Sequence, residues 1–372
     1  MRVDVVDPSA YTPPYDHALC DGLARAGADV RLVTSRFAYG AVPRRPGYAV
    51  QERFYRRALG RPGSRTRLAV KLAQHVPDML AYRSAARSAD AVHFQWLTLP
   101  PLDARLLPSG RPVVLTAHDV LAREPRGGRA GRALLRAAQR RLLDRVDAVV
   151  VHSEDGRGRL LREARLEPAK VHVIPHGAFA HLLELPEERP LAPGLAGVEG
   201  PVVLLFGLLR PYKGLDVLLE AWRGVTGAEL WVVGMPRMDL GPLRAAAPPG
   251  VRFVERFVSD AEIPALFRRA DLVVLPYREI DQSGVLFTAL AFGRPLLLSA
   301  VGGFPDIALS GAAELVPPGD AVALHDALTR LLGDEAARAR LAARAARAAR
   351  ERFGWDAIAR RHLDLYRGLL ER

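Results

Sequence analysis

The sequence predicts an α/β protein made of two doubly wound, Rossmann-like domains of similar size that face a central cleft. Two observations support this. Short β-branched runs alternate with longer helical patterns in both halves of the chain, and the alternation pauses once, at a segment rich in proline and glycine. Strand–helix alternation is typical of a parallel sheet with helices on both faces. Ligands bind such sheets beyond the carboxyl ends of the strands, so we expect a site in the cleft.

The first half contains six strand-like runs, with helical patterns at 15–26, 132–145 and 158–164 between them. The strands are expected at 3–6, 30–34, 91–94, 113–116, 148–152 and 171–174. Residues 186–200 then hold three prolines and three glycines, which indicates a linker.

The alternation resumes after the linker. Strands are expected at 202–206, 229–233, 251–254, 272–275 and 295–299, and helices at 215–222, 263–269, 285–292, 321–332 and 335–350. We therefore predict an N-terminal domain over 1–185, the linker, and a C-terminal domain over 201–352. A last amphipathic segment, 353–372, is expected to pack back toward the N-terminal domain.

Composition excludes several classes of protein. The one cysteine, Cys20, allows neither an internal disulfide nor a cysteine zinc cluster, which fits the cytoplasm. Acidic residues interrupt the apolar start of the chain, so it does not read as a signal peptide. The longest apolar runs are far below the roughly 20 residues that span a bilayer. Contact with a membrane would therefore be peripheral.

The net charge of +12 is concentrated in the first half, where residues 1–190 hold 31 Lys and Arg against 20 Asp and Glu. The most basic stretch, residues 44–71, contains nine basic residues and one acidic residue, Glu52. Apolar side chains lie between the basic ones. Such a segment fits an anionic membrane surface or, less well, nucleic acid. A solvated loop is the alternative. The nine are Arg44, Arg45, Arg53, Arg56, Arg57, Arg61, Arg65, Arg67 and Lys71.

The segment 206–216 is the most informative, because it follows a buried strand and opens a helix. Gly207 allows a ligand to approach the backbone closely. Arg210 and Lys213 place two cations where helix N–H groups also favour anions, which suits a diphosphate. The alternative is an ordinary loop with solvated bases.

The segment 276–295 also joins the end of a strand to the start of a helix, with neutral polar groups at the helix start. A strand ends at Pro276, and a helix begins near Ser283 and Gly284, whose N–H groups form a second anion site. Gln282 and Ser283 suit sugar or ribose hydroxyls. Ser283 is also a good helix cap, and the two roles are compatible.

Together with residues 173–177, 270–276 and 301–306, these segments resemble, in order and spacing, the family-4 glycosyltransferases, which are retaining enzymes of GT-B architecture. The resemblance covers nearly the whole chain. It implies transfer of a hexose from a nucleotide-diphosphate sugar to a glycan, lipid-linked or small-molecule acceptor, in polysaccharide or glycoconjugate biosynthesis. It implies no cofactor, since the nucleotide sugar is a substrate.

The resemblance also implies a donor site in the C-terminal domain. Lys213 matches the family's diphosphate-binding lysine, whereas Leu208 stands where an arginine is usual and Arg210 replaces it. The base contact is expected around Arg256, Phe257 and Val258, which leaves uridine and guanosine open. Further donor contacts are expected from Gly207, Gln282, Ser283, Gly284, Val285 and Thr288.

The chain departs from the family at a pair of glutamates, whose positions hold Ile280 and Thr288. The neighbouring acids Glu279 and Asp281 are the candidates for the lost catalytic contacts. This departure keeps two alternatives open. One is a nucleotide-sugar epimerase of the same architecture, and the other is an inactive relative that only binds nucleotide sugar.

His118 is the main catalytic candidate of the first half, since it ends a strand and resembles the histidine that contacts the donor sugar in the family. His93 and Trp96 end the preceding strand and are candidates for acceptor binding, with core packing as the alternative. Pro14 and Tyr15 replace a loop that is often glycine-rich and are expected to shape the acceptor pocket.

We expect no bound metal. The sequence contains no Asp-x-Asp pair, which holds a divalent cation in another common glycosyltransferase architecture. The resemblance implies instead that positive side chains and a helix N-terminus stabilise the leaving diphosphate.

Overall fold

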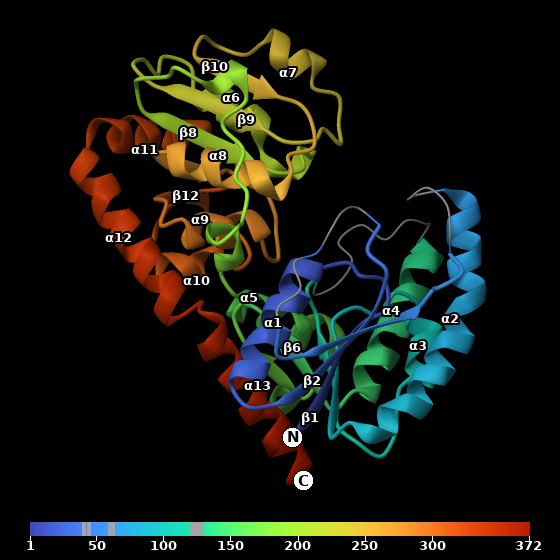
Figure 1. The fold of residues 1–372 in the computed structure, drawn as a ribbon. Helices are drawn as coiled ribbons and strands as arrows, with labels where there is room; N and C mark the ends of the chain where they lie inside the picture. Colours follow the sequence, from blue (N-terminus) through green and yellow to red (C-terminus); the bar gives the residue numbers. More distant parts are fainter. Residues whose placement is uncertain (39–41, 43–45, 59–63, 120–128) are drawn as a thin grey trace. The chain divides into compact units, whose positions relative to one another are not determined.

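The computed structural model describes residues 1–38, 42, 46–58, 64–119 and 129–372. The chain forms two compact units, of which the first comprises Met1–Pro175 with Trp355–Arg372 and the second His176–Gly354 (Figure 1). Each unit is built on one parallel sheet, which confirms the predicted pair of doubly wound domains. The units divide after Pro175, whereas the sequence pattern placed the end of the first domain at residue 185.

The first unit contains a seven-stranded sheet in the order β3-β2-β1-β4-β5-β6-β7. The central strand β1 places Val5 opposite Leu32 of β2 and opposite His93 of β4. The edge strand β3 was not predicted, because half-exposed polar residues interrupt its apolar pattern. The strands are β1 (Arg2–Asp7), β2 (Asp29–Ser35), β3 (Ala49–Phe54), β4 (Ala91–Phe94), β5 (Val113–Thr116), β6 (Ala148–Val151) and β7 (Val171–Val173).

Helices cover both faces of this sheet (Figure 1). The side chains of α1 and α13 form one core with alternate strand residues such as Val5, while α2, α3, α4 and α5 pack on the other face with residues such as Val6. This alternation follows from the two-residue period of a strand. The helices are α1 (Pro13–Arg25), α2 (Arg65–Ala85), α3 (Pro100–Leu106), α4 (Arg129–Arg145), α5 (Glu154–Ala164) and α13 (Trp355–Leu370), with 3-10 turns η1 (Ala86–Ser88) and η2 (Pro168–Lys170).

The contact between α1 and α13 depends on Gly22. A Cβ atom at this position would lie 2.8 Å from the carbonyl oxygen of Trp355 and 3.3 Å from the Cβ of Ala359. The absence of a side chain therefore lets the last helix of the chain lie directly on the first. This explains how residues 355–372 belong to the same unit as residues 1–175.

We expect Gly22→Ala to lower the free energy of unfolding by about 1–3 kcal/mol, because overpacking forces the two helices apart. Gly368→Ala is the matched control, since Gly368 lies on α13 with open space around its Cβ direction. There the same change should raise stability by roughly 0.5–1 kcal/mol through helix propensity. Urea unfolding of both variants provides the measurement. Equal effects at the two positions would show that the close helix contact contributes nothing.

The basic stretch 44–71 is partly regular structure, which corrects the alternative of a solvated loop. Its described part includes β3 and the start of α2, where the Ser64 hydroxyl accepts a hydrogen bond from the Arg67 backbone N–H at 3.3 Å. Arg44, Arg45 and Arg61 lie outside the described residues. The helix was missed because arginines occupy its first turn and a proline interrupts its apolar pattern.

The second unit contains a six-stranded sheet in the order β10-β9-β8-β11-β12-β13 around one large core. The strands are β8 (Val202–Phe206), β9 (Glu229–Val233), β10 (Val251–Val254), β11 (Leu272–Leu275), β12 (Leu296–Ser299) and β13 (Ala313–Val316). The helices are α6 (Leu215–Ala221), α7 (Gly241–Ala245), α8 (Ile263–Arg269), α9 (Gly284–Ala291), α10 (Phe304–Ala308), α11 (Ala321–Gly333) and α12 (Glu335–Glu351). The 3-10 turns are η3 (Ala180–Leu183), η4 (Pro193–Leu195), η5 (Pro211–Lys213) and η6 (Asp260–Glu262).

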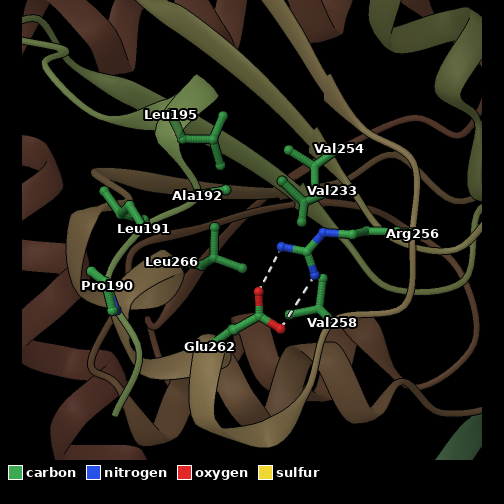
Figure 2. A pocket seen from close by; sticks show the side chains of 10 residues that line it. All are labelled: Pro190, Leu191, Ala192, Leu195, Val233, Val254, Arg256, Val258, Glu262 and Leu266. Carbon is green, nitrogen blue, oxygen red and sulfur yellow. Dashed lines mark hydrogen bonds and ion pairs between the residues drawn. The ribbon is translucent and has the colours of Figure 1, made fainter.

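The predicted linker packs against the second unit rather than extending away from it. Leu195 belongs to the core of this unit, and the Arg189 backbone N–H donates to the carbonyl of Ala261 at 2.8 Å. Figure 2 shows Leu191 and Leu195 lining one small pocket together with Arg256. The pocket measures about 10 Å³, which is room for roughly one water molecule.

None of the helices in the described ranges has the length and apolar character that crossing a bilayer requires.

Candidate functional site

Three loops, those after β8, β11 and β12, meet at the carboxyl ends of the strands in the second unit, where glycines allow close backbone contacts. Gly214 has a φ of +68°, and a Cβ there would lie 2.0 Å from the carbonyl oxygen of Pro276. Gly302 has a φ of +54°, and its Cβ would lie 1.9 Å from the carbonyl oxygen of Ile280. Only glycine fits at such positions. The loops after β8, β11 and β12 are thus fixed to one another.

Lys213 is buried in the loop after β8. Its Nζ donates to the carbonyl oxygen of Phe206 at 3.2 Å and lies 5.1 Å from the centre of the Tyr277 ring. A Cβ at Gly207 would come within 2.9 Å of this Nζ, so the glycine keeps space open for the ammonium group. Burial, with a smaller contribution from Arg210, lowers the pKa of Lys213 to about 8. The site therefore holds an incompletely solvated cation that a bound anion would stabilise.

Arg210 lies three residues before Lys213, immediately before the η5 turn, and is exposed. Leu208, at the position of the family's usual arginine, is also exposed. The β8 loop therefore presents one buried and one solvent-accessible cation. This arrangement fits a ligand with two anionic groups, such as a diphosphate.

The loop after β11 leads into α9, and Ser283 stands at the N-cap of this helix. Ser283 and Asp281 are buried, Gln282 is half-buried and Glu279 is exposed. The Ser283 hydroxyl makes no capping hydrogen bond, so capping does not explain its presence. The N–H groups of Gly284 and Val285 belong to the first turn, where backbone donors lack helical acceptors.

Thr288 occupies one of the two positions where the family has a glutamate. Its hydroxyl donates to the carbonyl oxygen of Gly284 at 3.0 Å, within the helix. The side chain is buried. Thr288 is thus engaged with its own helix rather than extended toward a ribose.

The three residues expected to contact the base differ in their environment. Arg256 pairs with Glu262 through two contacts of 2.6 and 3.2 Å, and this pairing lowers the pKa of Glu262 to about 2. Figure 2 shows the two groups facing each other beside Val258. Phe257 is 60% exposed, so its ring is available for stacking, whereas Val258 is buried.

His118 lies directly after β5 in the first unit, among aromatic side chains. Its ring stacks on Trp96 with 5.1 Å between centres and an interplanar angle of 14°. Tyr15 meets it edge-on at 4.8 Å. Three residues predicted from separate segments are therefore in direct contact. The rings limit the orientations open to the imidazole.

Hydrogen bonds fix the orientation of His118 further. Its Nδ1 lies 3.2 Å from Nε2 of His152, and its Nε2 lies 3.2 Å from the amide oxygen of Gln95. Nδ1 of His152 lies 3.0 Å from the carbonyl oxygen of Ile174 and must carry hydrogen to donate to it. Since burial lowers the pKa of His152 to about 4, its Nε2 remains an acceptor at neutral pH. Nδ1 of His118 therefore donates to His152, and the side-chain amide of Gln95 lies beside Nε2.

His152 was not among the predicted site residues. It follows β6 just as His118 follows β5, and the two strands are neighbours. That placement at adjacent strand ends is the signal that sequence analysis could have used.

The remaining acceptor candidates separate into two groups. Pro14 is exposed, and the Trp96 Nε1 donates to the hydroxyl of Thr12 at 2.9 Å. His93 is fully buried, with Nδ1 at 2.6 Å from the Tyr366 hydroxyl and Nε2 at 2.7 Å from the Thr116 hydroxyl. This environment favours the core-packing alternative for His93.

Two parallel-sheet domains, one with a buried cation among its strand-end loops, define an α/β protein with a candidate anion site. Comparison with known proteins identifies the family. Residues 15–178 match the model described as Glycosyltransferase Family 4, and residues 200–334 match the model described as Glycosyl transferases group 1. The two models together cover most of the chain, and this chain belongs to the family-4 glycosyltransferases. The resemblance predicted from the motifs is confirmed.

Individual relatives agree with this assignment. The chain is 27% identical over 328 residues to a D-inositol 3-phosphate glycosyltransferase of Kineococcus radiotolerans, an alignment that covers 77% of this chain and 73% of the relative. It is 30% identical over 203 residues to a GDP-mannose:glycolipid 4-beta-D-mannosyltransferase of Xanthomonas campestris pv. campestris, covering 51% of this chain and 50% of the relative. The chain thus aligns with about half the length of the second relative.

The solved structures confirm the architecture. Sucrose-phosphate synthase from Thermosynechococcus elongatus superposes with a TM-score of 0.76, covering 100% of this chain and 99% of the other at 22% identity. This likeness establishes the GT-B fold predicted from the sequence.

Proposed function

We propose that this protein is a retaining glycosyltransferase that moves a hexose from a nucleotide-diphosphate sugar to a glycan, lipid-linked or small-molecule acceptor in polysaccharide or glycoconjugate biosynthesis. The observation that carries the proposal is Lys213, a buried ammonium in a loop at the carboxyl ends of the strands. The relative that acts, by its name, on GDP-mannose supports a nucleotide-sugar donor. The base remains either uridine or guanosine.

The donor diphosphate would bind Lys213, Arg210 and the N–H groups at the start of α9. As the bond between the anomeric carbon and the phosphate oxygen breaks, its electron pair moves to the diphosphate. The two cations neutralise this charge, and Lys213 does so from a buried position, where such stabilisation is strongest. The mechanism needs no metal, and we expect EDTA to leave the rate unchanged.

Retention is proposed to follow from front-face substitution. The acceptor hydroxyl forms its bond to the anomeric carbon on the face that the diphosphate leaves, and its proton passes to the departing phosphate oxygen. Asp281 and Glu279 are the nearby carboxylates, and we assign them to the hydroxyls of the donor sugar rather than to nucleophilic attack. We assign His118 to the same sugar, through the orientation that His152 and Gln95 impose.

We expect His152→Leu to reduce kcat about 10- to 100-fold with little change in the KM for the donor, because a small misplacement of His118 suffices for such losses. His152→Gln keeps an acceptor near Nδ1 of His118 and should recover part of the rate. The measurement is steady-state release of nucleoside diphosphate for the two variants. Equal rates for His152→Leu and wild type would rule out the orienting role.

The proposed function is tested by incubating the protein with UDP-, GDP- and ADP-hexoses, with and without EDTA, and following the products by mass spectrometry for transfer and by 1H NMR for sugar configuration. A transferase releases nucleoside diphosphate faster when a glycan acceptor is present, and the product keeps the anomeric configuration of the donor. A changed nucleotide sugar without any acceptor would establish the epimerase instead. Binding without turnover would establish an inactive relative.

We further propose that the first unit contacts an anionic membrane surface through the start of α2, which would place the acceptor at a lipid headgroup. Leu68 and Leu72 lie one helical turn apart on this helix, and both are exposed beside Arg65 and Lys71. Exposed leucines beside basic residues are typical of helices that lie on lipid.

Vesicle flotation tests the membrane contact. Wild type should float with vesicles that contain phosphatidylglycerol, and the double variant Leu68→Asp/Leu72→Asp should not. Leu309→Asp/Val322→Asp is the matched control, since both residues are exposed apolar side chains of the second unit. Flotation that is unaffected by the α2 variant would exclude this surface.

A further inference from the structure

The first unit contains a cavity that none of the predicted site residues lines. It measures about 260 Å³ and lies beside the first turn of α1, at the carboxyl end of β2 and along the first residues of β3. Asp16 and His17 contribute from α1, Thr34 and Ser35 from β2 and Glu52 from β3. The carboxyl ends of parallel strands are where α/β sheets bind their ligands.

The first turn of α1 separates this cavity from the His118 cluster. Tyr15 makes the edge contact with His118, whereas the next two residues, Asp16 and His17, line the cavity. A helix with its side chains is roughly 10–12 Å wide. A group bound in the cavity is therefore separated from the His118 ring by this helical turn and is distinct from the reacting hydroxyl.

Asp16 is one of the residues that line the cavity, and its side chain is almost completely buried. It forms a hydrogen-bonded pair with Asp7, whose carboxylate accepts backbone N–H groups of Ser9 at 3.1 Å and Thr12 at 3.2 Å. Because those donors stabilise the charge on Asp7, the shared proton resides on Asp16. Burial and the Asp7 charge raise the pKa of Asp16 well above its ordinary value. A neutral carboxyl both donates and accepts hydrogen bonds.

The cavity lining combines these groups with an apolar wall. Leu32, Val50 and Phe37 supply apolar side chains, and Thr34, whose hydroxyl donates to the Asp7 carbonyl oxygen at 2.8 Å, lies on the same face of β2 as Leu32. A lining that combines hydroxyl and carboxyl residues with apolar ones suits a pyranose ring, which has hydroxyls at its edge and C–H groups on its faces.

Size and charge exclude other ligands. Sites for drug-sized molecules measure about 300–1,000 Å³, so this cavity holds a single ring rather than a nucleotide. A phosphate would meet Arg36 but also Glu52 and the buried Asp7–Asp16 pair nearby. The balance of charges favours an uncharged ligand.

We propose that this cavity is an acceptor subsite that binds an uncharged pyranose ring adjacent to the acceptor unit that receives the hexose. This inference rests on the proposed transferase function and adds a substrate class to it. The natural acceptor then carries at least two ring units. An acceptor with a single ring should have a higher KM and an unchanged kcat.

Saturation-transfer NMR tests the subsite with methyl α-D-glucopyranoside, methyl α-D-mannopyranoside and methyl α-D-galactopyranoside as probes. At least one glycoside should receive saturation from the wild-type protein. The transfer should fall at least fivefold in Val50→Trp, which fills the cavity, and several-fold in Glu52→Gln, which keeps the shape. Val322→Trp, at an exposed position of the second unit, is the control and should match wild type.

Three outcomes would overturn the proposal. These are no saturation transfer to any glycoside, transfer that both cavity variants leave unchanged, or displacement of the glycoside by inorganic phosphate. Binding of UDP and GDP is measured on the same samples. Nucleotide binding without glycoside binding rejects the subsite alone, whereas glycoside binding without nucleotide binding rejects the transferase function and leaves the cavity as a sugar site.

Discussion

Lys213→Met is expected to weaken the binding of UDP or GDP about a hundredfold. A hundredfold change corresponds to about 2.7 kcal/mol, which is within the range of a charge-assisted hydrogen bond in a buried site. Methionine has a similar length and fills the space beside Gly207 and Tyr277 without a charge. Lys170→Met is the matched control, because Lys170 belongs to the first unit, where it donates to the carbonyl of Asp144 at 2.9 Å.

The same lysine predicts how binding depends on pH. The pKa of Lys213 is about 8 in the free protein, so the ammonium group loses its proton as the pH rises through that value. Affinity for the diphosphate should therefore fall between pH 7 and pH 8.5 in wild type. In Lys213→Met it should stay flat. Isothermal titration calorimetry at both pH values measures this, and a wild-type affinity that rises with pH would contradict the role of the ammonium.

Acidification from pH 6.5 to pH 5 is expected to destabilise the first unit strongly. His152 and His362 are both buried there, and burial lowers the pKa of each to about 4, against about 6.5 in an unfolded chain. Between these values the unfolded state binds more protons than the folded state, so stability falls as the pH falls. Each histidine should remove about 2 kcal/mol by pH 5, and about 3 kcal/mol once the pH reaches 4.

Urea unfolding followed by hydrogen exchange of peptides from β6 and α13 measures this loss at pH 7.5, 6.5 and 5. His152→Gln/His362→Leu removes both titrating groups and should flatten the dependence. A small dependence of stability on pH should remain in this variant, because burial also lowers the pKa of His93. A wild-type protein whose first unit is equally stable at pH 7.5 and pH 5 would contradict the neutral state of these histidines.

Most of the sheet structure was predictable because buried parallel strands are continuous apolar runs. The strands at 91–94, 113–116 and 202–206 match their predictions to the residue. The edge strands β3 and β13 were not predicted, because half-exposed polar residues interrupt their apolar patterns. Helix α2 escaped for a related reason, since its arginines and Pro77 obscure a buried face that includes Met79 and Tyr82.

In the candidate site, too, features encoded by residues close in sequence were predictable, whereas contacts that depend on the tertiary fold were not. The loop around Lys213 was predictable because its glycine and cations are neighbours in the sequence. The contact of His152 with His118 was not, because it depends on the pairing of β5 and β6. The shared proton of Asp7 and Asp16 likewise requires the fold of the loop between them.

The central claim is that the loops after β8 and β11 bind the diphosphate of a nucleotide sugar. Hydrogen–deuterium exchange of the wild-type protein with and without UDP, GDP or ADP tests it most directly. We predict that one of these nucleotides protects peptides covering residues 206–214 and 276–285, and that Lys213→Met abolishes the protection. Protection confined to other segments, or none with any of the three nucleotides, would contradict the account.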